Sequence, residues 1–221
     1  MRTHITILFD NEARVAGLQT GWGFSCLILR GEHSLLFDTG WDGLQILENA
    51  RRLGIDLAGV RHVFLSHAHW DHAGGLPQVL SALARPRVYV PASISRRLQA
   101  ELARRAEVVA IKEPRRLLPG MHTTGELGED TKEQSLVVEL EQGAALLTGC
   151  AHPGLDAILA HAARGHEIKV VIGGFHGFDR IEDLAGLELV VPCHCTVHAA
   201  AILARWPGVA RAGGVGACFG L

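Results

Sequence analysis

The sequence predicts a layered α/β fold in which two β-sheets lie between helices. Three observations support this prediction. Short runs rich in Val, Ile and Leu recur along all 221 residues, and their length suits strands. Segments with helix-capping residues lie between them. The runs cluster early and again in the middle, with helices after each cluster, which is neither strict βαβ alternation nor an all-β pattern.

The strands and helices can be assigned in order. The expected strands are 4–9, 24–29, 34–37, 60–65, 88–90, 108–111, 135–140, 144–147, 168–172 and 189–191. Asp42 can cap a first helix, with Gln45 completing a capping box and Gly54 ending it. Ser93 can cap a second helix that reaches about Arg105. Further helices are expected after Gly75, Pro153 and Thr196, and Gly165 supplies another stop.

Composition narrows the classes of protein. The chain is 48% hydrophobic and 20% charged, with a net charge of −2, so we expect a single globular domain over 1–221 and no nucleic-acid partner. The basic stretch 96–116 contains three glutamates and is interpreted as a solvated helix face. No apolar run is long enough for a membrane span or a signal sequence. Five scattered cysteines suit a reducing cytoplasm.

A dense group of metal-binding residues follows the expected strand 60–65. The segment Ser66-His67-Ala68-His69-Trp70-Asp71-His72 places two histidines at i and i+2 of an extended loop, where both side chains can face one cation. Asp71 and His72 come after the chain turns and can face a second cation. Imidazole and carboxylate are preferred ligands of zinc and similar divalent metals.

This pattern resembles the metallo-β-lactamase superfamily. The His-x-His-x-Asp-His motif and the Asp38-Thr39-Gly40 segment match its early landmarks. The later segments 147–154, 173–176 and 192–196 resemble a branch of bacterial and archaeal hydrolases that includes dihydropterin ribofuranosyl-aminobenzene phosphate synthases. The resemblance spans nearly the whole chain, and it implies a four-layer αβ/βα sandwich with the metals at the sheet edge.

The resemblance also implies ligands from later loops. His152 and His194 each follow a strand and precede a helix, as such ligands do in the family. We therefore predict one metal held by His67, His69 and His152, and another held by Asp71, His72 and His194. The third ligand of the first position is either His152 or Glu126, because 123–126 stands where many relatives carry a Gly-His ligand.

Two further residues follow from the same resemblance. Asp38 is expected to orient a ligating histidine rather than to bind metal itself. Cys150 stands where the superfamily often has a bridging aspartate, and it is either a thiolate ligand or a structural cysteine. Cys193 and Cys195 flank His194 in the sequence, so if His194 points at the metal, both are expected to point away from it on account of the alternation of side chains.

The function predicted is hydrolysis of an ester- or phosphate-containing small molecule by metal-activated water. The metal expected is Zn²⁺, with Mn²⁺ or Fe²⁺ as alternatives. Asp71 and His176 are the candidate catalytic residues. An iron-dependent redox enzyme and a non-catalytic metabolite-binding protein remain alternatives. Helices expected to start near Leu76, Gly154 and Thr196 suggest that the substrate carries an anionic group.

Overall fold

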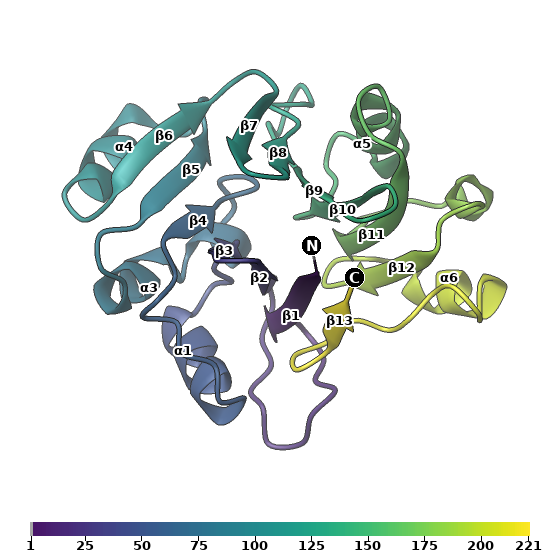
Figure 1. Ribbon diagram of the computed structural model, residues 1–221, viewed down its shortest axis with the longest axis horizontal. Coiled ribbons are helices and arrows are strands. Elements are labelled where there is room, and N and C mark those ends of the chain that lie inside the picture. The colour runs from purple at the N-terminus through teal and green to yellow at the C-terminus, as the bar shows by residue number, and fades with distance from the viewer. Residues whose placement is uncertain (1) are drawn as a thin grey trace.

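The computed structural model describes residues 2–221 and contains two mixed β-sheets. The first sheet has seven strands in the order β13-β1-β2-β3-β4-β5-β6. Its strands are β1 (Thr3–Phe9), β2 (Ser25–Arg30), β3 (His33–Phe37), β4 (His62–Phe64), β5 (Arg87–Pro91), β6 (Glu107–Ile111) and β13 (Cys218–Gly220). β13 pairs with β1, so the two ends of the chain lie side by side (Figure 1).

The second sheet has six strands in the order β12-β11-β10-β9-β8-β7. Its strands are β7 (Arg115–Leu118), β8 (Met121–Thr123), β9 (Leu136–Glu139), β10 (Ala144–Thr148), β11 (Ile168–Gly174) and β12 (Leu189–Cys193). β10, β11 and β12 are parallel, as are β3 to β6 in the first sheet. The carboxyl ends of these strands carry the loops that form the candidate site.

Helices cover the outer face of each sheet (Figure 1). The first sheet is covered by α1 (Gly43–Arg52), α3 (Leu76–Ala82) and α4 (Arg96–Ala103), and α2 (Trp70–Ala73) is a single turn at its edge. The second is covered by α5 (Leu155–Ala162), α6 (Ala199–Arg205) and the 3-10 turn η1 (Ile181–Leu184). This arrangement confirms the predicted four-layer sandwich.

The packing has three apolar clusters that match the layers. One lies between the sheets and includes Phe37, Phe64 and Leu147. A second lies between the first sheet and its helices, and a third between the second sheet and its helices. Strands that face apolar layers on both sides are buried at every position, as β10 and β12 are, which explains their continuous hydrophobic runs.

Several local predictions are confirmed and others are wrong. The Asp42 carboxylate accepts hydrogen bonds from the N–H groups of Leu44 and Gln45, so it caps α1 as expected, but the Gln45 side chain binds Thr20 instead of completing a capping box. The cap of α4 is Ser95 rather than Ser93, because the Ser95 hydroxyl accepts from the N–H of Leu98.

The basic stretch 96–116 is not one helix face. Its first part forms α4, and its last part forms the start of the hairpin β7–β8, which the Arg-rich sequence concealed. The short strand β13 was also not predicted. α6 begins at Ala199, three residues later than expected, because Thr196 is held in the preceding turn by its hydrogen bond to the carbonyl of Cys193. No helix within residues 2–221 is long and apolar enough to cross a membrane.

Candidate metal centre

Three strand ends bring the predicted ligands to one edge of the two sheets. The loop after β4 carries His67 and His69 and leads into α2, whose first turn carries Asp71 and His72. Cys150 and His152 follow β10, and His194 follows β12. Because these strands end at the same side of the sandwich, residues far apart in sequence meet there.

The first group of ligand atoms comes from His67, Cys150 and His152, all within 4.8 Å of one another. His69 lies beside them. Its ring centroid is 4.7 Å from that of His67 and 4.7 Å from that of His152. His69 is solvent-exposed and stands outside the tight group, at its open side.

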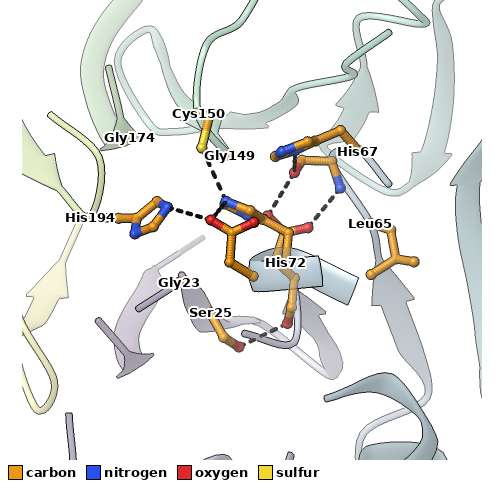
Figure 2. A network of polar contacts seen from close by, with 12 residues as sticks. Gly23, Ser25, Leu65, His67, His72, Gly149, Cys150, Gly174 and His194 are labelled. Atoms are coloured by element: carbon orange, nitrogen blue, oxygen red, sulfur yellow. Dashed lines mark hydrogen bonds and ion pairs between the residues drawn. The ribbon is translucent and has the colours of Figure 1, made fainter. Parts of the chain in front are cut away.

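The second group comes from Asp71, His72, Cys150 and His194, again with ligand atoms within 4.8 Å. Nε2 of His194 is 3.2 Å from a carboxylate oxygen of Asp71, and Nε2 of His72 is 3.1 Å from the sulfur of Cys150. Figure 2 shows Cys150, His194 and His67 arranged around His72. The structure thus brings the six predicted ligands together.

Asp38 fixes the orientation of two of these histidines. Its carboxylate accepts from Nδ1 of His72 at 2.7 Å and from the hydroxyl of Ser66 at 2.7 Å. Since the Ser66 proton goes to Asp38, the Ser66 oxygen must accept from Nδ1 of His67, 2.8 Å away. Both rings therefore carry hydrogen on Nδ1, and both Nε2 atoms have a bare electron pair toward the centre.

The Nε2 atom of His67 is the feature of this centre that best fits a metal ligand. Its Nε2 is fully buried and has no hydrogen-bond partner among residues 2–221. Burial lowers the pKa of His67 to about 3 and that of His72 to about 3, so both rings are neutral. An unpaired buried nitrogen is costly, and a divalent cation would satisfy it.

Glu133 orients His152 in the same way as Asp38 orients His72, and this role was not predicted from the sequence. This buried carboxylate accepts from Nδ1 of His152 at 2.8 Å. It also accepts backbone N–H groups, those of Gly149, Cys150, Ala151 and His152, at 2.9 to 3.0 Å. Burial would raise the pKa of Glu133, but the hydrogen bond from His152 and the other donors lower it to about 2.

Asn11 and Asp10 hold His194. Nδ1 of His194 lies 3.1 Å from the side-chain oxygen of Asn11, whose amide nitrogen donates to the His194 carbonyl at 3.0 Å. Asp10 accepts the backbone N–H of His194 at 2.9 Å. The Nε2 of His194 and the Asp71 oxygen that it faces are both electron-pair donors, so a proton or a cation must lie between them.

Strained and close-packed backbone surrounds the site. Five non-glycine residues among those described have positive φ, and four of them belong to the site loops: Asp38, Ala151, His176 and His194. Gly149 fits only without a side chain, because a Cβ there would lie 2.2 Å from the Ser66 hydroxyl. Such strain at one place is typical of functional sites.

Four further residues near the site can be compared with what the sequence suggested or left open. Glu126 is not a ligand, because its carboxylate binds the backbone N–H of Ser93 and belongs to neither ligand group. Cys195 does not point away, since its sulfur contacts the carbonyl of Cys150 at 3.9 Å. Cys193 does point into the apolar core, as predicted. His176 is exposed, and its ring centroid lies 5.2 Å from that of His152.

Exposed tryptophans border the second group. Trp22 packs edge-on against the ring of His194 at 5.0 Å, and Trp70, inside the metal motif, contacts Trp41 at 6.3 Å. Their exposed fractions are 54% for Trp22, 45% for Trp41 and 61% for Trp70. Large apolar side chains that remain this exposed beside a polar centre form a surface suited to a small-molecule ligand.

The two-sheet fold and the grouped ligand atoms fit a known class of α/β proteins. Residues 22–167 match the metallo-β-lactamase superfamily, and the chain belongs to that superfamily. Its members are mostly metal-dependent hydrolases. The match includes the motif from His67 to His72 as well as Cys150 and His152, and it ends before His194.

Individual relatives agree with this assignment. The 7,8-dihydropterin-6-methyl-4-(beta-D-ribofuranosyl)-aminobenzene-5'-phosphate synthase of Methanocaldococcus jannaschii is 24% identical over 73% of this chain and 75% of its own length. A solved metal-dependent hydrolase of the β-lactamase superfamily is 29% identical, with a TM-score of 0.81 and 98% of both chains covered. YhfI from Bacillus subtilis, 14% identical, has the same fold, with a TM-score of 0.75 over 100% of both chains.

Proposed function

We propose that the protein is a metal-dependent hydrolase that cleaves an ester or phosphate ester of a small molecule. One metal position would be held by His67, His69 and His152, and the other by Asp71, His72 and His194. The observation that carries the proposal is the convergence of bare Nε2 atoms on one centre, with His67 Nε2 buried and unpartnered.

Zinc suits this donor set best, because imidazole, carboxylate and thiol ligands match a borderline divalent ion; Mn²⁺ and Fe²⁺ are the alternatives. When bound, such an ion supplies Lewis acidity and lowers the pKa of water. Around it, Asp38 and Glu133 hold the imidazoles of His72 and His152 in the ligating tautomer.

Two residues are assigned to the chemistry itself. The Asp71 carboxylate, at the edge of the second group, would orient the attacking water through a hydrogen bond. His176, exposed beside His152, would donate a proton from its ring to the leaving oxygen. His176 follows β11 with a φ of 47°, and its ring centroid lies 5.2 Å from that of His152.

The substrate is proposed to carry a phosphate. The curated relative is named for a product that contains a 5'-phosphate. The helix starts predicted beside the ligands give less support, since α3 and α6 have only 7 residues each. The relative's name describes a synthase, so a bond-forming reaction at the same site is the second candidate. The free cysteines are consistent with a cytoplasmic protein.

A substrate panel tests the proposed function. Phosphate mono- and diesters are compared with neutral lactones and thioesters, using protein loaded with Zn²⁺ and the same protein after chelation. We expect turnover of the phosphate esters, its loss on chelation and in His67→Ala, and competitive inhibition by inorganic phosphate. Turnover that survives both treatments would overturn the metal-dependent mechanism.

The role of His176 has its own test. His176→Gln should slow esters with poor leaving groups by about 100-fold, the usual contribution of a general acid. Activated esters such as nitrophenyl phosphate need no proton at the leaving oxygen, so their turnover should change little. Equal slowing of both kinds of ester would show that His176 is not the proton donor.

A further inference from the structure

Three of the four tryptophans form one aromatic surface beside the metal centre. Trp22 lies in the loop between β1 and β2, Trp41 in the loop between β3 and α1, and Trp70 at the start of α2. The rings of Trp41 and Trp70 meet edge to face, with centroids 6.3 Å apart. A Cβ built at Gly21, the neighbour of Trp22, would lie 2.9 Å from Nε1 of Trp41. The three side chains therefore share one stretch of surface, which we call the tryptophan surface.

The tryptophan surface is continuous with the second group of ligand atoms. The ring of Trp22 packs edge-on against the ring of His194, with centroids 5.0 Å apart. Trp70 stands between His69 and Asp71 in the motif, so it has a predicted ligand on each side in the sequence. A substrate whose reacting group is held at the metals would therefore have its remaining part beside these indoles.

Close backbone packing holds the tryptophan surface in place. Gly23, which follows the first tryptophan, has a φ of 142°, and a Cβ there would lie 2.2 Å from the carbonyl oxygen of Asp71. A Cβ at Gly74 would lie 2.4 Å from the carbonyl oxygen of Trp70 and 2.9 Å from that of Trp41. The indoles are thus carried by backbone segments packed tightly against one another. A ligand that binds them loses less free energy to ordering the protein than it would on a loose loop.

Exposed apolar side chains gather around this part of the molecule. Among residues 2–221, eight large apolar side chains are exposed. Five of them lie beside the ligands or the tryptophans: Trp22, Trp41, Leu44, Trp70 and Val197. Val197 comes three residues after His194, and its N–H donates to the carbonyl of His176 at 2.9 Å. Apolar residues scattered singly over a surface need no explanation, but a group of them beside one polar centre indicates a binding surface.

The shape of the exposed side chains determines what they can bind. Indoles are flat and rigid, and they pair with other aromatic rings, edge to face or offset, more strongly than the buried area alone explains. We propose that the tryptophan surface binds an aromatic ring of the substrate, next to the group that is cleaved. The proposal rests on the proposed function and narrows it: the substrate class becomes aryl or heteroaryl esters and phosphate esters.

Two phosphonates test the proposal by binding rather than by activity. Phenylphosphonate carries a flat ring, and cyclohexylphosphonate carries a puckered ring with the same number of carbon atoms. Saturation-transfer NMR detects which ligand protons contact the protein, and titration gives the dissociation constants. In the zinc-loaded protein, phenylphosphonate should bind about 3- to 10-fold more tightly than cyclohexylphosphonate, with saturation at its ring protons. In the chelated protein both should bind more weakly, and the ring contact should persist.

Substitutions then assign the preference to the tryptophan surface. Trp22→Leu and Trp70→Leu keep an apolar side chain but remove the flat ring, so each should reduce the preference for phenylphosphonate by about 3-fold or more. Leu98→Ala is the matched control, because Leu98 is an exposed apolar residue of α4 outside the tryptophan surface, and it should keep the full preference. The zinc content and melting temperature of each variant show whether the centre and the fold are intact.

The opposite results separate this inference from the proposed function. Equal affinity for the two phosphonates, or a preference that survives in both Trp→Leu variants, would overturn the aromatic assignment. Tighter binding of cyclohexylphosphonate would assign the surface to an alkyl group and overturn it as well. No saturation at the ring protons in either form of the protein would have the same consequence. A preference for the flat ring together with equal affinities before and after chelation would support the tryptophan surface but contradict the metal-dependent function.

Discussion

Asp38 and Glu133 are fully buried carboxylates that orient histidines of the same centre, one from each half of the chain, yet their pKa values differ. Asp38 is 0% exposed and Glu133 1%. Burial raises the pKa of Asp38 to about 7, whereas the pKa of Glu133 is about 2 despite the same burial. Depth below the surface therefore does not decide whether a carboxylate is ionised.

The difference lies in the donors that replace water. Asp38 accepts one backbone N–H, that of Ser66, together with the Ser66 hydroxyl and the His72 ring. Glu133 accepts the four backbone N–H groups of residues 149 to 152 and the ring of His152. A carboxylate surrounded by N–H groups keeps its charge in the interior, because those groups replace its hydration. Glu133 thus holds a whole loop, while Asp38 holds two side chains.

The largest effect is expected for Glu133→Gln. The amide removes the charge and places an NH2 group against backbone donors, so the free energy of unfolding should fall by about 3 kcal/mol. For a chain of this size the melting temperature should fall by roughly 6 to 12 °C. Calorimetry measures this, with Glu126→Gln as a control. Equal stability of both variants would contradict the central role of Glu133.

Acid titration of the metal-free protein should separate the two carboxylates. The pKa of Glu133 is lowered from 4.5 to about 2, so its contribution, about 3 kcal/mol, is present above pH 4.5 and is lost as the pH falls toward 2. The pKa of Asp38 is raised from 3.8 to about 7, so its contribution is present below pH 3.8 and is lost as the pH rises through 7.

Urea denaturation from pH 2 to 8 measures how the free energy of unfolding changes with pH, which should be in opposite directions for the two carboxylates. Because His67 and His72 also titrate in the acid range, each contribution is taken as the difference between the wild type and a variant. The wild type should lose its advantage over Glu133→Gln below pH 4.5, and its advantage over Asp38→Asn should shrink above pH 4. If the free energies of unfolding of the two variants changed with pH in the same way, Asp38 and Glu133 would not differ as described.

A smaller effect is expected for Asp38→Asn at pH 7. The asparagine can accept the N–H of Ser66 with its one oxygen, so the two hydrogen bonds from the Ser66 hydroxyl and the His72 ring are lost, together worth about 2 kcal/mol. The His72 ring then loses the acceptor that fixes its tautomer, and metal affinity should fall by about 10 to 100-fold. Competition with a chromogenic chelator measures that affinity, and unchanged binding would show that Asp38 does not orient His72.

The smallest effect is expected for Glu48→Gln. Hydrogen bonds from Arg51 and Arg52 lower the pKa of Glu48 to about 2, the same value as for Glu133. Glu48 lies on the exposed face of α1, however, where water and salt screen ion pairs. The melting temperature of Glu48→Gln in physiological salt should match that of the wild type. A clearly lower melting temperature would show that burial is not what distinguishes Glu133 from Glu48.

The parts of the fold and site that the sequence predicted depend on local signals. The motif after the strand 60–65 identified His67 from the residues alone, and the resemblance added His152 and His194, which follow strands that end at the same edge. Asp38 and Cys150 were identified only through the family resemblance. The hairpin β7–β8 was hidden because Arg115 and Arg116 face solvent and break the apolar pattern of a strand.

The site residues that could not be predicted from the sequence interact with partners that are far away along the chain. Glu133 lies in a polar loop, and nothing near it in sequence shows that its carboxylate accepts N–H groups 16 to 19 residues away. Asn11 orients His194 from 183 residues away. Such partners become visible only when the two sheets are packed against each other.

Metal content of the purified protein tests the central claim most directly. Elemental analysis of the wild type and of His67→Ala, prepared identically without added metal, is compared by moles of metal per chain. We expect zinc or a similar divalent metal in the wild type and the loss of most of it in the variant. Chelation should lower the melting temperature while unfolding stays cooperative. Full metal content in His67→Ala would contradict the account, because the buried Nε2 of His67 would then not be a ligand.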